Sequence, residues 1–130
     1  MPVFEIETYK TNPQRKLYFW SDSAARLGDL ESWIADQPQD ERNNLARLLR
    51  KCFSHTQPRL SQSQEKFRKE FDNKGQGIYA IKSYQIRLIG IFRGIDFCVI
   101  HYLRKKTSKL SQDDIKTIKD RHNRYLLEKK

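Results

Sequence analysis

The order of apolar and polar residues predicts two extended segments at the start of the chain. Residues 3–9 (VFEIETY) alternate apolar and polar side chains, as a half-buried strand does. Residues 16–20 form a second short run, which we expect to pair with the first across the Thr-Asn-Pro-Gln turn. The chain therefore opens with a strand and a short partner strand.

The pattern then changes to the period of a helix. Ser21 or Ser23 is placed to cap a helix over residues 24–36, and Pro38 suits the first position of a second helix. The second helix carries an apolar stripe at helical spacing, formed by Leu45, Leu48, Leu49, Cys52 and Phe53. Two consecutive helices are expected here.

A polar stretch separates these helices from a run of strands. We interpret residues 54–76 as a loop with one turn of helix at 66–71. Residues 77–82, 85–92 and 96–103 are rich in β-branched and aromatic side chains, which favour strands. The breaks between them are very short, so the three strands should be consecutive and antiparallel.

A closing helix completes the predicted fold. Ser111 followed by Asp114 resembles a capping box, and the helix after it presents an apolar face. The order of elements predicts an α+β domain, in which a small antiparallel sheet of three to five strands has the helices on one face. A chain of 130 residues makes a single domain over residues 1–130.

Strand alternation allows side chains to be assigned to faces of the sheet. Two-residue turns at 83–84 and 94–95 would place nine residues on an almost wholly apolar face: Tyr79, Ile81, Ile86, Leu88, Phe92, Phe97, Val99, His101 and Leu103. The opposite, open face would then carry Lys82, Arg87, Tyr102 and Arg104 at one corner. Like charges at this spacing cost free energy unless an anion relieves them, so this corner is a candidate phosphate site.

Charge supports a polyanionic partner. The net charge is +10, but residues 1–45 hold five basic and eight acidic side chains, whereas residues 46–130 hold 21 basic and eight acidic. The balances are therefore −3 and +13, and a nucleic acid would be drawn to the second half. A solvated basic surface with a solubility role is the alternative. An anionic membrane fits less well, because the basic segment is strand-like rather than an amphipathic helix.

The second half of the chain resembles a known family. The stretches GQGIYAIKSYQIRLIGIF and FCVIHYLRKKTSKLSQDDI are similar to the RelE/ParE toxin superfamily, and most similar to its HigB-like, phage-derived branch. The resemblance covers about residues 76–127. The matching residues are Gly77, Ile78, Tyr79, Ile81, Lys82, Arg87, His101, Leu103, Lys105, Lys106, Thr107 and Lys109. The family's strand glutamate is Ala80 here, and its usual proline after the KKT segment is replaced by Leu110-Ser111.

The resemblance implies a RelE-like fold with a curved sheet, and a toxin of a bacterial type II toxin–antitoxin system. Such a toxin is a cytoplasmic endoribonuclease that cleaves messenger RNA on the ribosome and is held inactive by an antitoxin, often a helix-turn-helix protein. Two alternatives stay open: a ParE-like poison of DNA gyrase, and a non-cleaving RNA-binding relative, which Ala80 favours.

RNA cleavage without a metal needs a base, an acid and cations around one phosphate. Arg87 can offer a bidentate fork to the scissile phosphate, with Lys82 and Arg104 as further cations. Tyr102 can exchange a proton or stack on a base, and His101 has the best intrinsic pKa for proton transfer but is assigned to the apolar face. If the register slips, His101 enters the site and Tyr102 leaves it.

The remaining cations are expected to bind the RNA backbone. These residues are Lys105, Lys106, Lys109 and Arg93. Neither a metal nor an organic cofactor is expected, because the sequence shows no cluster of metal ligands and no phosphate-binding loop. Cys52 and Cys98 lack metal-ligand spacing and suit a reducing cytosol. The sequence shows neither a secretory signal nor an apolar run long enough to span a membrane.

Overall fold

The computed structural model describes nine elements in the order strand, strand, helix, helix, four strands, helix. The described residues are 3–5, 17–21, 29–52, 67–94, 96–107 and 109–129. The elements are β1 (Val3–Glu5), β2 (Leu17–Trp20), α1 (Asp29–Ala35), α2 (Gln39–Cys52), β3 (Phe67–Asn73), β4 (Gln76–Ser83), β5 (Ile86–Arg93), β6 (Asp96–Arg104) and α3 (Gln112–Lys129). Predicted structure at 6–9, 16, 22–28 and 53 lies outside the described residues.

The strands form one sheet with the order β1-β2-β6-β5-β4-β3. All neighbouring pairs are antiparallel except β2 and β6, which run parallel with Leu17 opposite Phe97 and Phe19 opposite Val99. The α+β class is confirmed. The expectation of a purely antiparallel sheet of three to five strands is wrong, because the sheet has six strands and one parallel pair.

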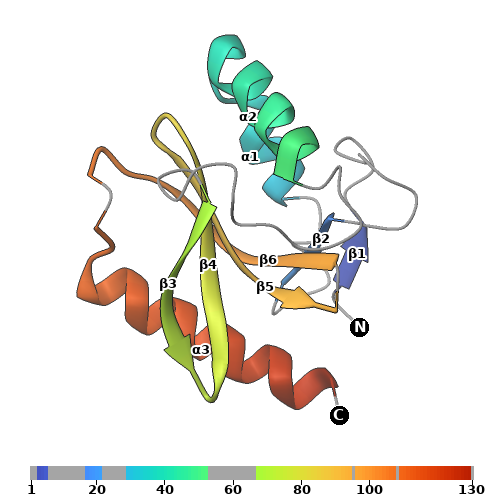
Figure 1. Ribbon diagram of the computed structural model, residues 1–130, viewed down its shortest axis with the longest axis vertical. Coiled ribbons are helices and arrows are strands. Elements are labelled where there is room, and N and C mark those ends of the chain that lie inside the picture. Colours follow the sequence, from blue (N-terminus) through green and yellow to red (C-terminus); the bar gives the residue numbers. More distant parts are fainter. Residues whose placement is uncertain are drawn as a thin grey trace.

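Helices cover both faces of the sheet, as Figure 1 shows. One core lies between the sheet and α1 and α2, and is formed by Phe19, Leu30, Ile34, Leu45, Leu48, Leu49, Ile81, Ile86, Leu88, Phe97 and Val99. The second core lies between the sheet and α3, and is formed by Trp20, Ile78, Ala80, Ile89, Ile91, Cys98, Ile100, Leu110, Ile118 and Tyr125. The prediction that the helices share one face is therefore wrong. The face expected to be open is apolar in its middle, and α3 buries it.

The helix α3 begins as its sequence predicts. The Oγ of Ser111 accepts a hydrogen bond from the backbone N of Asp114 at 3.1 Å and donates to the Asp114 carboxylate at 2.8 Å. The first of these hydrogen bonds gives a partner to the backbone N–H of Asp114, one of the donors that the first turn of a helix leaves without an acceptor. The capping role predicted for Ser111 is confirmed.

The strand β3 corrects the expectation of a helical turn at 66–71. It pairs with β4 through a tight turn at Lys74 and Gly75, whose φ values of 53° and 78° are both left-handed. Such a turn matches the twist of a hairpin, and Gly75 adopts it without steric cost. The strand is mostly charged and lies at the sheet edge, so the apolar alternation that identifies a strand is weak here.

The register of the last two hairpins decides which side chains share a face. Ser83 pairs with Ile86, so the β4–β5 turn is Tyr84-Gln85 rather than 83–84. Moving this turn by one residue keeps Lys82 and Arg87 on one face, directly opposite each other. Between β5 and β6 the predicted pair Arg93 and Asp96 is confirmed.

A β-bulge then changes the register of β6. Gly90 pairs with Val99, but Ile89 pairs with His101, so Ile100 is the extra residue. Every residue of β6 after the bulge therefore exchanges faces: His101 and Leu103 turn to the α3 side, and Tyr102 and Arg104 turn to the α1 and α2 side. The earlier face assignments of these four residues are wrong.

We predict that Gly90→Ala destabilises the fold because the bulge leaves no space for a side chain. A Cβ at this position would lie 2.2 Å from the backbone O of Cys98 and 2.8 Å from the Phe97 ring. Because a backbone atom cannot move aside cheaply, the free energy of unfolding in urea should fall by about 1–3 kcal/mol. Leu127→Ala, on a side chain that is 71% exposed, is the control and should change it by less than about 0.5 kcal/mol.

Candidate functional site

Lys82 and Arg87 form the part of the predicted basic corner that the structure brings together. They lie opposite each other on β4 and β5, and both are buried, with 7% and 6% of their surface exposed. Two neighbouring cations in a buried position require compensating groups. The contacts of each residue show how the protein supplies them.

Lys82 is compensated by a carboxylate from the edge strand. Its Nζ lies 3.6 Å from Glu70 Oε2, and the same carboxylate accepts a hydrogen bond from Arg68 Nε at 3.0 Å. Burial lowers the pKa of Lys82, Glu70 opposes this effect, and the charges of Arg68 and Arg87 add to it. Glu70 sits where the β3–β4 register shifts, and the sequence pattern gave no signal for this pairing.

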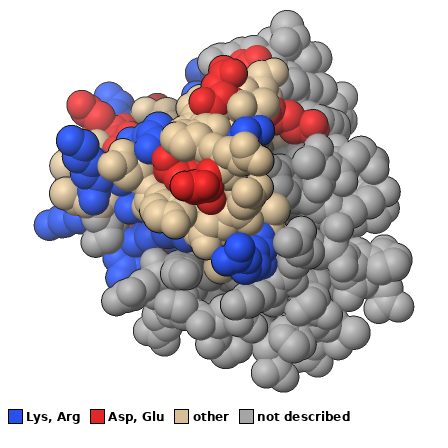
Figure 2. Space-filling model, turned by 90° about the horizontal axis from the view of Figure 1, so that it is seen from above, with Lys and Arg blue, Asp and Glu red and all other residues tan. Residues whose placement is uncertain are grey.

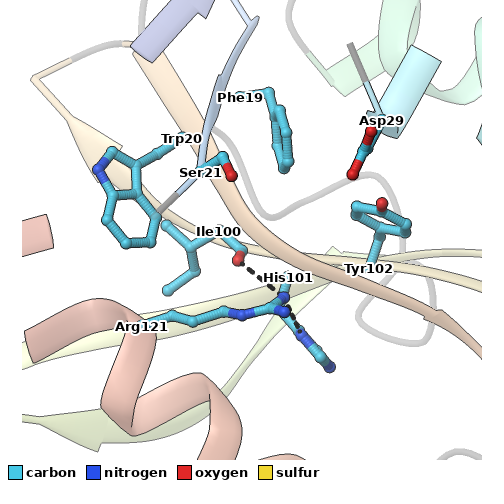
Figure 3. Close-up of a pocket in the computed structure, with 8 residues that line it drawn as sticks. All are labelled: Phe19, Trp20, Ser21, Asp29, Ile100, His101, Tyr102 and Arg121. Carbon is cyan, nitrogen blue, oxygen red and sulfur yellow. Dashed lines mark hydrogen bonds between the residues drawn. The ribbon is translucent and has the colours of Figure 1, made fainter. Parts of the chain in front are cut away.

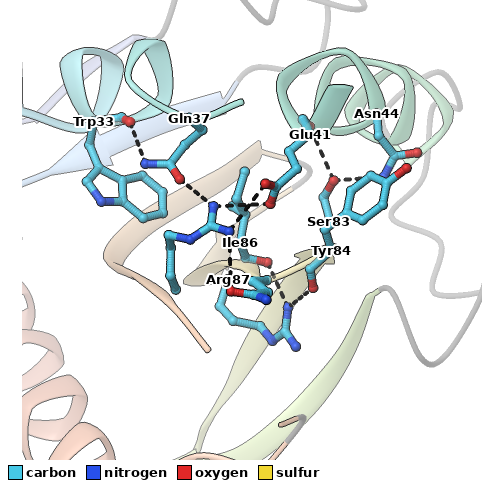
Figure 4. Close-up of polar contacts among 10 residues, drawn as sticks. Trp33, Gln37, Glu41, Asn44, Ser83, Tyr84, Ile86 and Arg87 are labelled. Carbon is cyan, nitrogen blue, oxygen red and sulfur yellow. Dashed lines mark hydrogen bonds and ion pairs between the residues drawn. The ribbon is translucent and has the colours of Figure 1, made fainter. Parts of the chain in front are cut away.

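Arg87 is compensated by backbone carbonyls. Its Nη1 donates to the carbonyl oxygens of Tyr84 and Ile86 at 2.6 and 3.0 Å (Figure 4). Its Nη2 donates to Thr107 O at 3.4 Å. Its Nε is buried and has no hydrogen-bond partner. Arg87 therefore fastens the β4–β5 turn to the connection between β6 and α3, and its buried Nε–H has no acceptor.

Arg104 and Tyr102 do not join this corner. Arg104 lies on the opposite face, where its Nη1 donates to Gln37 and forms an ion pair with Glu41 at 3.1 Å. The Tyr102 ring packs against Trp33 and Phe19, with ring centroids 4.9 and 5.9 Å apart. The prediction that Lys82, Arg87, Arg104 and Tyr102 converge is therefore wrong. The bulge turns each side chain after it to the opposite face of the sheet.

The same bulge moves His101 to the α3 side of the sheet. Its Nδ1 lies 2.7 Å from Arg121 Nη1, and its Nε2 lies 4.0 Å from Asp114 Oδ1. Burial and the Arg121 charge lower the pKa of His101 to about 4, against the opposing effect of Asp114. The imidazole is therefore neutral near pH 7, and because Arg121 can only donate, Nδ1 is its acceptor.

The predicted RNA-binding lysines follow β6 directly. Lys105 forms an ion pair with Asp114 at 3.7 Å, so Asp114 lies between Lys105 and His101. Lys106 and Lys109 are exposed. Figure 2 shows blue side chains gathered at its left edge, where Figure 1 shows this connection. The fourth predicted residue, Arg93, is at the far end of the strand, with its guanidinium 5.0 Å from the centre of the Tyr18 ring.

A small cavity of about 210 Å³ opens beside the bulge (Figure 3). It is lined by Phe19, Trp20, Ser21, Asp29, Ile100, His101, Tyr102 and Arg121. Of these residues, His101 and Tyr102 were predicted from the sequence to belong to the site, whereas Asp29 and Arg121 were not. Both lie on helices outside the resemblance's matching residues, and no motif marks either of them.

The other candidate groups have structural roles. His122 is fully buried and lies 2.8 Å from both Asn73 Nδ2 and Gln76 Oε1, which joins α3 to the β3–β4 hairpin. Burial raises the pKa of the Cys98 thiol to about 12, so it is not a nucleophile at neutral pH. Cys52 and His55 have side chains outside the described part of the chain.

Neither a group of metal ligands nor a membrane-spanning helix is found among the described residues. In the described ranges, no three His, Cys, Asp or Glu side chains are grouped so that they could hold a metal ion. Among the described helices, none combines the length and the apolar character needed to cross a membrane. No family model, curated protein or solved structure matches the chain.

We predict that Glu70→Gln destabilises the protein because it removes the carboxylate facing the buried ammonium of Lys82. Breaking a buried pair in this way typically costs about 3–5 kcal/mol in the free energy of unfolding. Asp72→Asn is the matched control, because the Asp72 carboxylate is 62% exposed and pairs with Lys69 at the surface, so its loss should cost less than about 1 kcal/mol. Equal effects of the two variants in urea unfolding would contradict the buried pair.

We also predict that His101 makes the protein less stable as the pH falls. Its pKa is about 4 in the folded protein and near 6.5 when exposed, so the unfolded chain binds more protons between these values. The contribution of the neutral His101 to the free energy of unfolding is fully present above about pH 6.5 and is lost progressively as the pH falls to 4. His101→Gln should reduce this loss, measured as unfolding free energy against pH, whereas Lys106→Gln should leave it unchanged. An unaltered pH profile in His101→Gln would show that His101 does not titrate in this way.

Proposed function

We propose that this chain is a type II toxin of the RelE/ParE superfamily that cleaves messenger RNA on the ribosome without a metal ion. The motifs of β4, β5 and β6 and the excess positive charge of residues 46–130 support it. The observation that carries it is the placement of His101, a neutral imidazole at the edge of a cavity and beside an arginine.

Of the groups that RNA cleavage needs, the arrangement offers a base and a cation. A neutral imidazole can take the proton from a 2′-hydroxyl, whose oxygen then attacks the adjacent phosphorus. The bond from phosphorus to the 5′-oxygen breaks, and that oxygen leaves with a proton taken from water. Arg121 holds Nδ1 of His101 in the absence of RNA. A phosphate is a stronger acceptor for a guanidinium than an imidazole is, so bound RNA would draw Arg121 towards its phosphate and release the nitrogen. The same movement brings positive charge to the reacting phosphate.

The connection between β6 and α3 would hold the rest of the strand. Lys106 and Lys109 are exposed, and Lys105 is beside them. Contacts from such lysines are to phosphates, so they add affinity without choosing a sequence. Under this proposal the partner that restrains the toxin is an antitoxin, of the helix-turn-helix class, whose acidic surface covers this connection.

A second candidate function, RNA binding without cleavage, is favoured by a specific observation. Lys82, Arg87 and Arg104, the three cations expected to stabilise the transition state, all make internal contacts. Ala80, which stands where the family has a glutamate, is 1% exposed beneath α3. A glutamate introduced at position 80 would therefore be buried, and the experiment would report on folding as much as on catalysis.

We predict that His101→Gln abolishes RNA cleavage but preserves RNA binding, because it removes the proton acceptor and leaves the lysines in place. The experiment is induced expression in bacteria, with cleavage sites mapped on messenger RNA and binding measured on purified protein. His122→Gln is the matched control, since it is also a buried histidine but belongs to α3 itself and does not line the cavity, and thermal unfolding shows whether each variant is folded.

The outcomes separate the candidates. The proposal is supported if the wild type cleaves RNA, if His101→Gln reduces this cleavage at least a hundredfold, and if His122→Gln retains it. Cleavage that persists in folded His101→Gln overturns the role of His101. RNA binding by the wild type without any cleavage favours the second candidate, and DNA damage with intact message favours a gyrase poison.

A further inference from the structure

The cavity beside the bulge exists because two parallel strands differ in length. The β2–β6 ladder covers only Leu17–Phe19 against Phe97–Val99. β2 ends at Trp20, whereas β6 continues to Arg104. Within the described residues, the part of β6 after the ladder has no strand beside it on this edge. The backbone of Ile100, His101 and Tyr102 therefore forms one wall of the cavity.

Opposite charges approach this cavity from different elements. Asp29, the first residue of α1, and Arg121, from α3, both line it. Figure 3 shows Asp29 directed towards Tyr102 on one side of β6, and Arg121 extended along the other side towards His101 and the Ile100 carbonyl. A ligand in the cavity would therefore meet hydrogen-bond acceptors at one end and donors at the other.

The walls are aromatic and aliphatic. Phe19 and Tyr102 meet edge to face, with ring centroids 5.9 Å apart and 60° between the ring planes, and Ile100 adds an aliphatic surface. Unstacked bases of single-stranded RNA stack on aromatic side chains of this kind. The volume of about 210 Å³ is below the range of about 300–1,000 Å³ that drug-sized ligands occupy, and so suits one base rather than a whole nucleotide.

Guanine is the base whose edges match this pair of charges. Its ring N–H and exocyclic amine are adjacent donors that one carboxylate can accept together. Its O6 and N7 are adjacent acceptors, to which an arginine binds with its two-pronged fork. Adenine has an amine in place of O6, and uracil has no exocyclic amine. A guanidinium carries five N–H donors, so Arg121, once RNA has drawn it away from His101, can serve a base and the neighbouring phosphate together.

We infer that this cavity is a guanine-binding pocket, in which Asp29 accepts from the donor edge of the base and Arg121 donates to its O6 and N7. Guanine chemistry has two sources, a base in an RNA strand and a free guanosine nucleotide. The strand is the source that fits the proposed function, on which this part of the inference rests, because a base here would hold its backbone beside His101. The pocket would then decide where the toxin cuts.

The test uses binding to RNA that cannot be cleaved. Short uridine-rich strands with 2′-O-methyl sugars and one central guanine, adenine or hypoxanthine are compared by fluorescence anisotropy on the wild-type chain. Hypoxanthine is guanine without its exocyclic amine, so it tests the Asp29 contact without altering the protein. The guanine strand should bind at least tenfold more tightly than the adenine strand, and about fivefold to tenfold more tightly than the hypoxanthine strand.

The matched variants are Asp29→Asn and Asp36→Asn, the second changing an exposed carboxylate after the end of α1. Asp29→Asn should bind guanine and hypoxanthine strands equally, and Asp36→Asn should keep the wild-type preference. Equal wild-type affinity for all three strands, or an unchanged preference in folded Asp29→Asn, would overturn the inference.

Competition with guanosine monophosphate distinguishes the two sources. Displacement of the guanine strand only at millimolar nucleotide supports the RNA strand as the ligand, whereas micromolar displacement would overturn that part and assign the pocket to a free nucleotide. The inference and the proposed function also fail separately. Cleavage without a base preference would refute the role of the pocket in choosing the cut and leave the nuclease standing. A guanine preference without cleavage would refute the nuclease and leave the pocket standing.

Discussion

The candidate site depends on one irregularity, the bulge that Ile100 introduces into β6 opposite Gly90. Strict alternation would direct His101 towards α1 and α2, and would leave Tyr102 and Arg104 on the side of Arg87. The extra residue reverses this assignment, so that one strand presents Phe97 and Val99 to the first core and then His101 to α3. The absence of a side chain at Gly90 makes the bulge possible, because no Cβ fits beside the Cys98 carbonyl. The backbone geometry at Gly90 and Ile100 therefore decides on which face of the sheet residues 101–104 lie.

The charged residues of the late strands divide into internal and external sets. Lys82, Arg87 and Arg104 have their charges balanced by Glu70, by carbonyl oxygens and by Glu41, respectively. These contacts join β3, the β4–β5 turn and α2 to the same end of the sheet. Lys106 and Lys109 face solvent and supply the attraction for a polyanion. Some basic residues of one sequence motif can therefore stabilise the fold while others bind a ligand. Only the contacts seen in the structure show which residue does which.

Periodicity predicted the elements whose signal is local. The stripe of α2, the capping box of α3 and the hairpins of β4, β5 and β6 follow from short-range spacing, and the structure shows them. Three features depend on distant partners and could not be predicted in this way. β3 is a strand because β4 pairs with it, the bulge depends on packing across the sheet, and α3 covers the face opposite α1 and α2. Asp29 and Arg121 reach the cavity through these same long-range contacts, so no sequence pattern identified them.

The parallel contact between β2 and β6 also has a consequence for how the chain is made. Leu17 pairs with Phe97, 80 positions later in the sequence. Closing so long a loop costs entropy before any contact repays it, which makes such pairing slow. β2 leaves the ribosome first and has no β6 to pair with until most of the chain has been synthesised. The cavity walls supplied by Phe19 and by the bulge therefore come together late, so the nascent chain spends most of its synthesis without an assembled site.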